Sequence, residues 1–309
     1  MSFLRGDDRS AWSLPDSVDA LAASARQTSR PALIWGAGLA YQFVVLGWTF
    51  ASAVAGPLME GLTTGIEAPA IRIRPLQGME GLIRWIRREG LEAAIVAVPL
   101  ALLLFRLAGG LARLAPAARW AEHRGHRPPG LGRAWREGRG STLSGIGLWL
   151  LFVAMMLAAT VVFMGPTRLL LGTVREDTWN AATAIVSGVT VALLLVYGFL
   201  LSILFQLALH SLVQNRRGAA SALLHAWRIA RNDAMATARA TAVDAVLYLT
   251  LMAVILGAVT IQKMLLLPEA VLWLPYVAVV GFGGCARCVF WARAYEALGG
   301  ISTLGEEGR

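Results

Sequence analysis

The chain is poor in the residues on which disulfide-rich folds and soluble domains rely. It has two cysteines among 309 residues, Cys285 and Cys288, so a framework of several disulfides is excluded. Charged residues make up 15% of the chain, whereas soluble domains carry about 25%. Lysine occurs once, at Lys263, so arginine supplies nearly all of the positive charge. The shortage of charge argues against a large soluble core.

Long apolar runs take the place of the missing charge. Hydrophobic residues make up 57% of the chain, and they gather in stretches near the roughly 20 residues that a bilayer core requires. The expected membrane spans are residues 32–55, 91–112, 143–165, 180–212, 240–262 and 271–293. The sequence therefore predicts an all-α integral membrane protein with six transmembrane helices.

The arginines indicate how these helices are oriented. Between the spans, one side of the membrane would hold 18 basic residues and the other side 8. Cytoplasmic segments carry the excess of positive charge, so we expect both termini in the cytoplasm, in a multi-pass protein of a bacterial inner membrane. The external segment 57–90 opposes this rule locally with five arginines. Within it, residues 78–90 have helical amphipathic spacing, which fits either an interfacial helix or a lead-in to the second span.

A short pattern, Leu-x-x-(Ser/Ala)-x-Arg, occurs three times, before the first, third and fifth spans. The copies are Leu21–Arg26, Leu131–Arg136 and Leu223–Arg228. Two copies carry a tryptophan beside the arginine, and these anchor residues are Trp135, Arg136, Trp227 and Arg228. Tryptophan at headgroup depth with arginine reaching lipid phosphates is typical of an interfacial helix. The spacing predicts three helical hairpins, each preceded by a short amphipathic interface helix, although chance matches remain an alternative because Leu, Ala and Arg are abundant.

This repeat divides the chain into five regions. They are a cytoplasmic N-terminal segment with an interface helix (1–30), a first hairpin with an external amphipathic loop at 57–90 (31–112), an interface helix plus second hairpin (113–212), an interface helix plus third hairpin (213–298) and a disordered tail (299–309).

The C-terminal part resembles a known kind of membrane domain. Residues 210–233 read HSLVQNRRGAASALLHAWRIARND, and residues 290–298 read FWARAYEAL. Both stretches are similar to elements of bacterial multi-pass proteins of the glycerophosphodiester phosphodiesterase membrane-domain type and their uncharacterised relatives, best over residues 195–309. Ala226 stands where serine is usual in that family. The family's catalytic barrel is a separate soluble domain for which this chain has no room, so the resemblance implies a fold and no catalytic residue.

Four ionisable residues inside the expected spans are candidates for function, since buried charge is costly in a membrane. They are Arg106, His210, Asp244 and Arg287, all toward the cytoplasmic ends of their spans. Asp244 and Arg287 are expected at similar depth. One interpretation is an intramembrane ion pair that holds two helices together. The other is a basic pocket for a lipid phosphate, built from Arg106, Arg287 and His210.

The sequence offers little for catalysis or cofactor binding. Cys285 and Cys288 share a helix face in the motif Cys-Ala-Arg-Cys, but two thiolates make only half of a zinc site. The preceding glycines, Gly281, Gly283 and Gly284, favour close helix packing instead. No phosphate-binding loop, nucleophile elbow or zinc-protease motif occurs. We therefore expect no catalytic residue, no metal and no cofactor, and no nucleic acid among the partners.

Three functions remain in competition. The first is a non-catalytic membrane protein, serving as a subunit or scaffold of an envelope assembly or of a lipid-handling system. Its expected partners are the bilayer, anionic lipid headgroups and other membrane proteins. The second is the permease subunit of a transporter, such as an ATP-driven exporter. The third is a membrane-embedded lipid-modifying enzyme, which requires Arg106, His210, Asp244 and Arg287 to converge. The absence of catalytic motifs favours the first.

Overall fold

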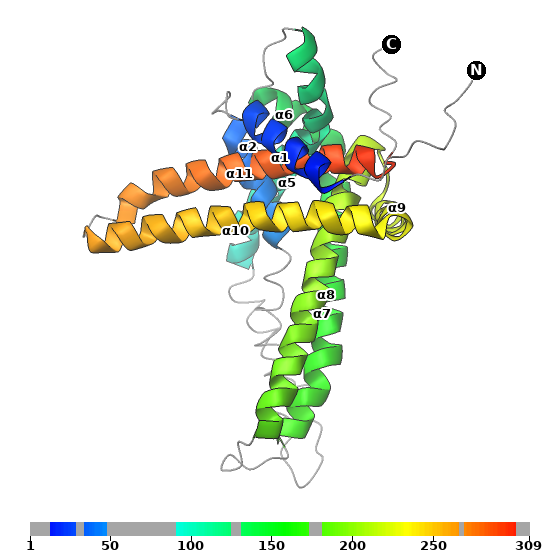
Figure 1. The fold of residues 1–309 in the computed structure, drawn as a ribbon, viewed down its shortest axis with the longest axis vertical. Coiled ribbons are helices and arrows are strands. Elements are labelled where there is room, and N and C mark those ends of the chain that lie inside the picture. Colours follow the sequence, from blue (N-terminus) through cyan, green and yellow to red (C-terminus); the bar gives the residue numbers. More distant parts are fainter. Residues whose placement is uncertain are drawn as a thin grey trace. The chain divides into compact units, whose positions relative to one another are not determined.

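A computed structural model describes six stretches of the chain, namely residues 13–28, 34–47, 91–124, 131–172, 181–265 and 269–300. Within these stretches all regular secondary structure is helical (Figure 1). The helices are α1 (Leu14–Thr28), α2 (Trp35–Gly47), α5 (Leu91–Arg124), α6 (Leu131–Glu137), the short 3₁₀ helix η4 (Gly138–Gly140), α7 (Thr142–Gly172), α8 (Ala181–Gln214), α9 (Ala219–Asn232), α10 (Ala234–Met264) and α11 (Glu269–Ala297). The expected all-α fold is confirmed for this part of the chain.

Five of the described helices are long and apolar enough to cross a membrane. The candidate spans are Ala97–Pro116, Thr142–Thr167, Ala184–Gln214, Ala234–Met264 and Tyr276–Ala297. They overlap the second to sixth spans expected from the sequence. The first expected span, 32–55, is described only as the 13 residues of α2. Its remainder lies outside the described residues, as do the 57–90 loop and residues 301–309, so the sixth helix and the complete set of hairpins stay predictions.

Local side-chain hydrogen bonds explain where two of the helices begin. The backbone N–H of Ser13 donates to the Asp16 carboxylate at 2.9 Å, and the Asp16 N–H donates to Ser13 Oγ at 3.3 Å, which is a capping box for α1. Asp233 separates α9 from α10 and accepts a hydrogen bond from the N–H of Ala236 at 3.1 Å. This N-cap starts α10 six residues before the expected span, so α10 is preceded closely by α9.

The three sequence repeats all fall on short helices, namely α1, α6 and α9. The small residue of the pattern is fully buried in every copy, at Ser24, Ala134 and Ala226. The arginine two positions later is exposed in every copy, at Arg26, Arg136 and Arg228. Because the three copies share this burial, the pattern marks the point at which each short helix packs closely on its surroundings. The anchor tryptophans, Trp135 and Trp227, are both exposed.

The chain divides into two compact units, which are described separately. Unit 1 comprises residues 1–45, 103–148 and 203–309. In it α10 and α11 lie side by side, and α1 packs against both of them (Figure 1). The span in α11 is 67% buried, whereas that in α10 is 11% buried. The core of unit 1 therefore forms around the C-terminal half of α11.

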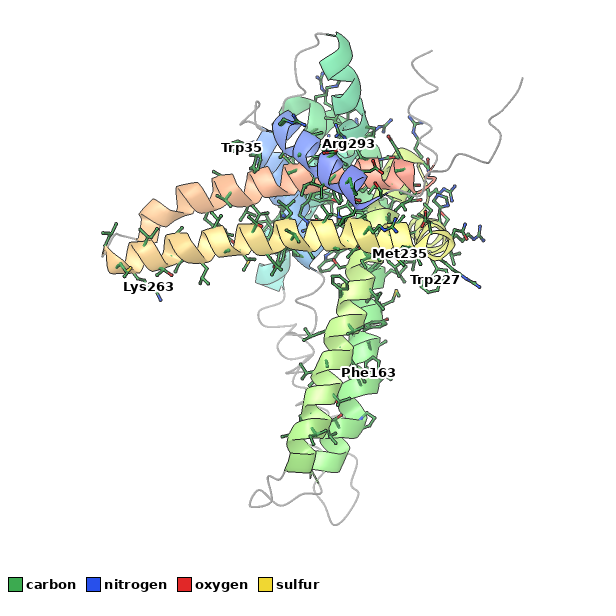
Figure 2. All side chains as sticks on the ribbon, in the orientation of Figure 1. Trp35, Phe163, Trp227, Met235, Lys263 and Arg293 are labelled. Atoms are coloured by element: carbon green, nitrogen blue, oxygen red, sulfur yellow. The ribbon has the colours of Figure 1, made fainter. Side chains whose placement is uncertain are left out.

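Unit 2 comprises residues 46–102 and 149–202. Its portions of α7 and α8 run alongside each other (Figure 1). Phe163, which is labelled in Figure 2, meets Tyr197 on α8 edge to face, with the ring centroids 6.3 Å apart. The hydroxyls of Thr167 and Thr190 bridge the same helices at 2.7 Å. Most of the aliphatic side chains around this pair are exposed. Such surfaces suit contact with lipid, which is as apolar as the side chains themselves.

Candidate functional site

An arginine–aspartate pair lies in the core of unit 1, between α10 and α11. Arg287 donates from Nε to Asp244 Oδ1 at 2.7 Å and from Nη2 to Asp244 Oδ2 at 2.6 Å. These two parallel bonds are the bidentate arrangement that suits a guanidinium fork and a carboxylate. Asp244 stands in the first half of α10 and Arg287 in the second half of the neighbouring α11. The structure thus brings these two of the four candidate residues together.

A third helix completes the surroundings of the guanidinium. Arg287 Nη1 donates to Gln42 Oε1 on α2 at 2.7 Å, so each of its three nitrogens has an acceptor. The Tyr248 ring lies one helical turn after Asp244, with its centroid 5.7 Å from Arg287 Cζ, within the range of a cation–π interaction. Gln42, Asp244 and Arg287 are all buried. We call Gln42, Asp244, Tyr248 and Arg287 the ion-pair cluster.

The ion-pair cluster is arranged to hold helices together. An unpaired charge in a low-dielectric core is strongly unfavourable, and pairing with further hydrogen bonds offsets that penalty. Here the two opposite charges cancel, and the bonds of Arg287 join α2, α10 and α11. Three of the five N–H donors of Arg287 are bonded within the protein and its charge is neutralised by Asp244, which leaves it poorly placed to bind an anionic substrate in addition. The geometry therefore fits the ion-pair interpretation of Asp244 and Arg287 better than the lipid-phosphate interpretation.

His210 belongs to a second buried row of polar side chains. The Tyr41 hydroxyl on α2 donates to Gln206 Oε1 at 2.5 Å and lies 3.4 Å from His210 Nε2. His210 Nδ1 in turn lies 3.3 Å from Gln214 Nε2. Gln206, His210 and Gln214 are spaced four residues apart, so they share one face of α8. Tyr41 precedes Gln42 in the chain, so α2 serves both the row and the ion-pair cluster.

Tyr295 continues this row toward α9. Its ring stacks on His210 with centroids 6.4 Å apart, and its hydroxyl accepts a hydrogen bond from Asn215 Nδ2 at 2.7 Å. On its other side, His225 of α9 meets the Tyr295 ring edge to face at 6.1 Å. Burial lowers the pKa of His225, and the charges of Arg217 and Arg228 lower it further. The row therefore links the span in α8 to the short helix α9.

Arg106 is engaged elsewhere. Its Nε donates to the Trp135 carbonyl oxygen at 2.9 Å, and its Cζ lies 3.9 Å from the centroid of the Trp135 ring. Among the described residues, no hydrogen bond or ion pair joins Arg106 to the other three candidates. The expected pocket of Arg106, His210 and Arg287 is therefore not what the contacts show. Instead, Arg106 fixes α6, and with it the anchor residue Trp135, to α5.

Glycines allow two of these helix contacts to be close. A Cβ atom at Gly284 would collide with the Gly38 carbonyl, and one at Gly38 would collide with the Gly281 carbonyl, so α2 and α11 cross backbone to backbone. A Cβ at Gly110 would likewise meet the Ala134 carbonyl of α6. The close packing expected at Gly281 and Gly284 is confirmed. It also brings α2 near enough for Gln42 to reach Arg287.

The two cysteines lie at the same crossing. Cys285 Sγ donates to the Ile34 carbonyl at 3.3 Å, and both Cys285 and Cys288 are buried, free thiols. In the described part of the chain, no group of three or more His, Cys, Asp or Glu side chains is placed to hold a metal ion. The contacts of Cys285 agree with the packing interpretation of the Cys-Ala-Arg-Cys motif.

Comparison with family models, curated proteins and solved structures found no match to this chain. The resemblance of residues 195–309 to the glycerophosphodiester phosphodiesterase membrane domain therefore stays a prediction.

Proposed function

We propose that this chain is a non-catalytic, multi-pass membrane protein that acts as a subunit or scaffold of a membrane assembly. The observation that carries the proposal is the ion-pair cluster. Asp244 and Arg287, both within membrane-spanning helices, are bonded to each other and to Gln42. An enzyme or a proton-coupled carrier needs such groups to face a substrate or to change partners. Here they join three helices, which is what a scaffold requires.

The short helices support the same proposal. Each repeat buries its small residue against unit 1 and leaves its arginine exposed, and two of the three leave a tryptophan exposed as well. Trp135 is additionally held by Arg106. Rigidly mounted aromatic and basic side chains at the ends of spans serve to set the depth of the helices in the bilayer and to meet lipid headgroups or a neighbouring subunit.

The test is gentle-detergent purification of the tagged protein, followed by quantitative mass spectrometry of what accompanies it. We expect a membrane protein partner in constant ratio to the chain. The double variant Asp244→Asn/Arg287→Gln keeps hydrogen-bonding groups but removes both charges, and it should retain that partner. The double variant Trp135→Glu/Trp227→Glu should lose it, and Trp135→Phe/Trp227→Phe should retain it as the matched control.

Two results would overturn the proposal. One is the absence of any partner in constant ratio to the wild-type chain. The other is an enzymatic or transport activity in reconstituted vesicles that disappears in Asp244→Asn/Arg287→Gln while thermal unfolding stays cooperative. That result would show that the charges act on a substrate.

A further inference from the structure

A basic pocket lies in unit 1, apart from the residues of the ion-pair cluster. It has a volume of about 250 Å³ and is lined by three arginines, Arg113, Arg216 and Arg217, and by the serines Ser141 and Ser144, among others. Arg113 comes from α5, the serines from the start of α7, and the adjacent arginines from the turn after α8. Three segments distant in the sequence therefore contribute hydrogen-bond donors to one cavity.

The pocket has an excess of positive charge. Arg113 Nε is paired with the carboxylate of Glu137 at 3.3 Å. The residues that line the pocket include three arginines and no acidic side chain. The lining of the pocket is therefore positively charged. Guanidinium forks match the geometry of phosphate oxygens, and serine hydroxyls add neutral donors. The chemistry thus favours an anionic ligand such as a phosphate group over a neutral ligand.

The backbone at the end of α8 holds the two adjacent arginines in place. The N–H of Arg217 donates to the Leu212 carbonyl at 3.2 Å, and Arg216 has a φ of 51°, in the left-handed region. Glycine is the residue usually found in that conformation after a helix. Arginine at this position, followed at once by a second arginine, directs both side chains to the pocket despite the less favourable backbone.

The position of the pocket along the helices indicates the depth of its ligand. Arg113 lies near the end of the span Ala97–Pro116, Ser144 near the start of Thr142–Thr167, and Arg216 just after Ala184–Gln214. Three spans thus end at the pocket, all on the side expected to be cytoplasmic. Phospholipid phosphates lie at such a boundary, and basic pockets between helices on this side bind anionic headgroups.

We propose that this pocket binds a phosphate group, through the guanidinium groups of Arg113, Arg216 and Arg217 and the hydroxyl of Ser144. The phosphate belongs either to an anionic lipid headgroup or to a soluble phosphate compound. This site goes beyond the non-catalytic role proposed above and does not depend on it, because a scaffold, a carrier or an enzyme would each retain it.

The experiment uses the full chain, delipidated in neutral detergent, with bound adducts measured by native mass spectrometry. The probes are phosphatidylglycerol, inorganic phosphate and, as a zwitterionic reference, phosphatidylcholine. The pocket variant is Arg216→Gln/Arg217→Gln. Its control is Arg133→Gln/Arg231→Gln, which removes one exposed arginine of α6 and one of α9, both outside the pocket. We expect the pocket variant to bind at least about tenfold more weakly, since each charge-assisted bond lost is worth about one such step.

A second pair of variants guards against a folding defect. Ser144→Asp places a carboxylate among the arginines without removing any of them, and Ser221→Asp adds the same charge at an exposed position of α9. Selective phosphatidylglycerol binding that is lost in both pocket variants and kept in both controls supports a lipid ligand. Inorganic phosphate binding with the same pattern and no preference for phosphatidylglycerol supports a soluble ligand. Equal binding by the pocket variants and the controls would show that the pocket does not bind phosphate. Arg216 and Arg217 would then only end helix α8.

Discussion

Unit 1 and unit 2 use different chemistry to hold their helices. In unit 1, helices cross at glycines and are joined by a bidentate ion pair and by amide and hydroxyl groups. In the helix pair of unit 2, the contacts between α7 and α8 include a threonine pair and an aromatic pair. The span in α11, all of it in unit 1, is 67% buried, whereas the span in α7, most of it in unit 2, is 28% buried.

This difference in helix packing follows from the lipid that surrounds a membrane protein. In lipid there is no hydrophobic drive to bring apolar helices together, so association depends on small residues and on polar contacts. Unit 1 has both at α11, whose span is 67% buried, while the span in α10 of the same unit is 11% buried. The aliphatic faces of unit 2 have neither, and they remain exposed to the surroundings. Altering the polar or small residues of unit 1 should therefore cost far more than comparable changes in unit 2.

The largest effect is expected from Arg287→Met. Removal of the guanidinium leaves Asp244 charged, buried and without its main partner, and breaking a buried pair in this way costs about 3–5 kcal/mol. The free energy of unfolding in neutral detergent measures the loss. Asp244→Leu/Arg287→Met removes both charges and should be more stable than the single variant. If the double variant is less stable than Arg287→Met, the unpaired charge of Asp244 is not the cause of the loss of stability.

A smaller loss is expected from Gly284→Val. The new side chain would meet the Gly38 carbonyl and force α2 away from α11, and overpacking of this kind costs about 1–3 kcal/mol. The control is Gly257→Val on α10, where no atom lies within 4 Å of the added Cβ. Both variants replace a helical glycine, so the difference between their unfolding free energies isolates the crossing. Equal losses would mean that the close contact is unimportant.

Much of the fold follows from the sequence because it depends on local pattern. Apolar length predicts the five spans, and the Leu-x-x-(Ser/Ala)-x-Arg repeat predicts three short helices at the observed places. The start of α10 was less predictable, since it depends on the Asp233 cap. The first expected span is described only in part, so the sequence remains the sole basis for it.

Only the part of the candidate site that lies between two neighbouring helices could be predicted from the sequence. Asp244 and Arg287 stand at similar depth on neighbouring helices, so their meeting could be expected from the topology. The contact of Gln42 with Arg287 and that of Arg106 with Trp135 depend on which helices cross, and this depends on glycine contacts far apart in sequence. The basic pocket is harder still, because Arg113, Ser144 and Arg216 come from three separate segments. The four-residue spacing of Gln206 and His210 was the one signal of the second polar row.

A slight effect is expected in unit 2 from Thr190→Val. The Thr190 hydroxyl contacts Thr167 across the helix pair and also bonds its own helix at Val186. Hydrogen bonds between membrane helices are worth about 0.6 kcal/mol on average. In the control Thr250→Val, the lost hydroxyl bonds only its own helix at Val246. Thr190→Val should lower the free energy of unfolding slightly more than Thr250→Val does. A loss in Thr190→Val as large as that in Gly284→Val would contradict the contrast between the units.

The last effect is a pH dependence confined to α9. Burial, followed by the charges of Arg217 and Arg228, lowers the pKa of His225 below its usual value of 6.5. The unfolded chain then binds a proton more readily than the folded one, so the packing of His225 on Tyr295 is fully stable above about pH 6.5 and weakens as the pH falls through that value. The protection of the α9 amides, which is their hydrogen-exchange rate compared with the intrinsic rate at the same pH, should therefore fall between neutral and mildly acidic pH. His225→Gln cannot take up the proton and should abolish that pH dependence, whereas the same loss of protection in His225→Gln would assign it to another group. Because α9 leads directly into α10, the size of this change measures how firmly the short helix is held on the core of unit 1.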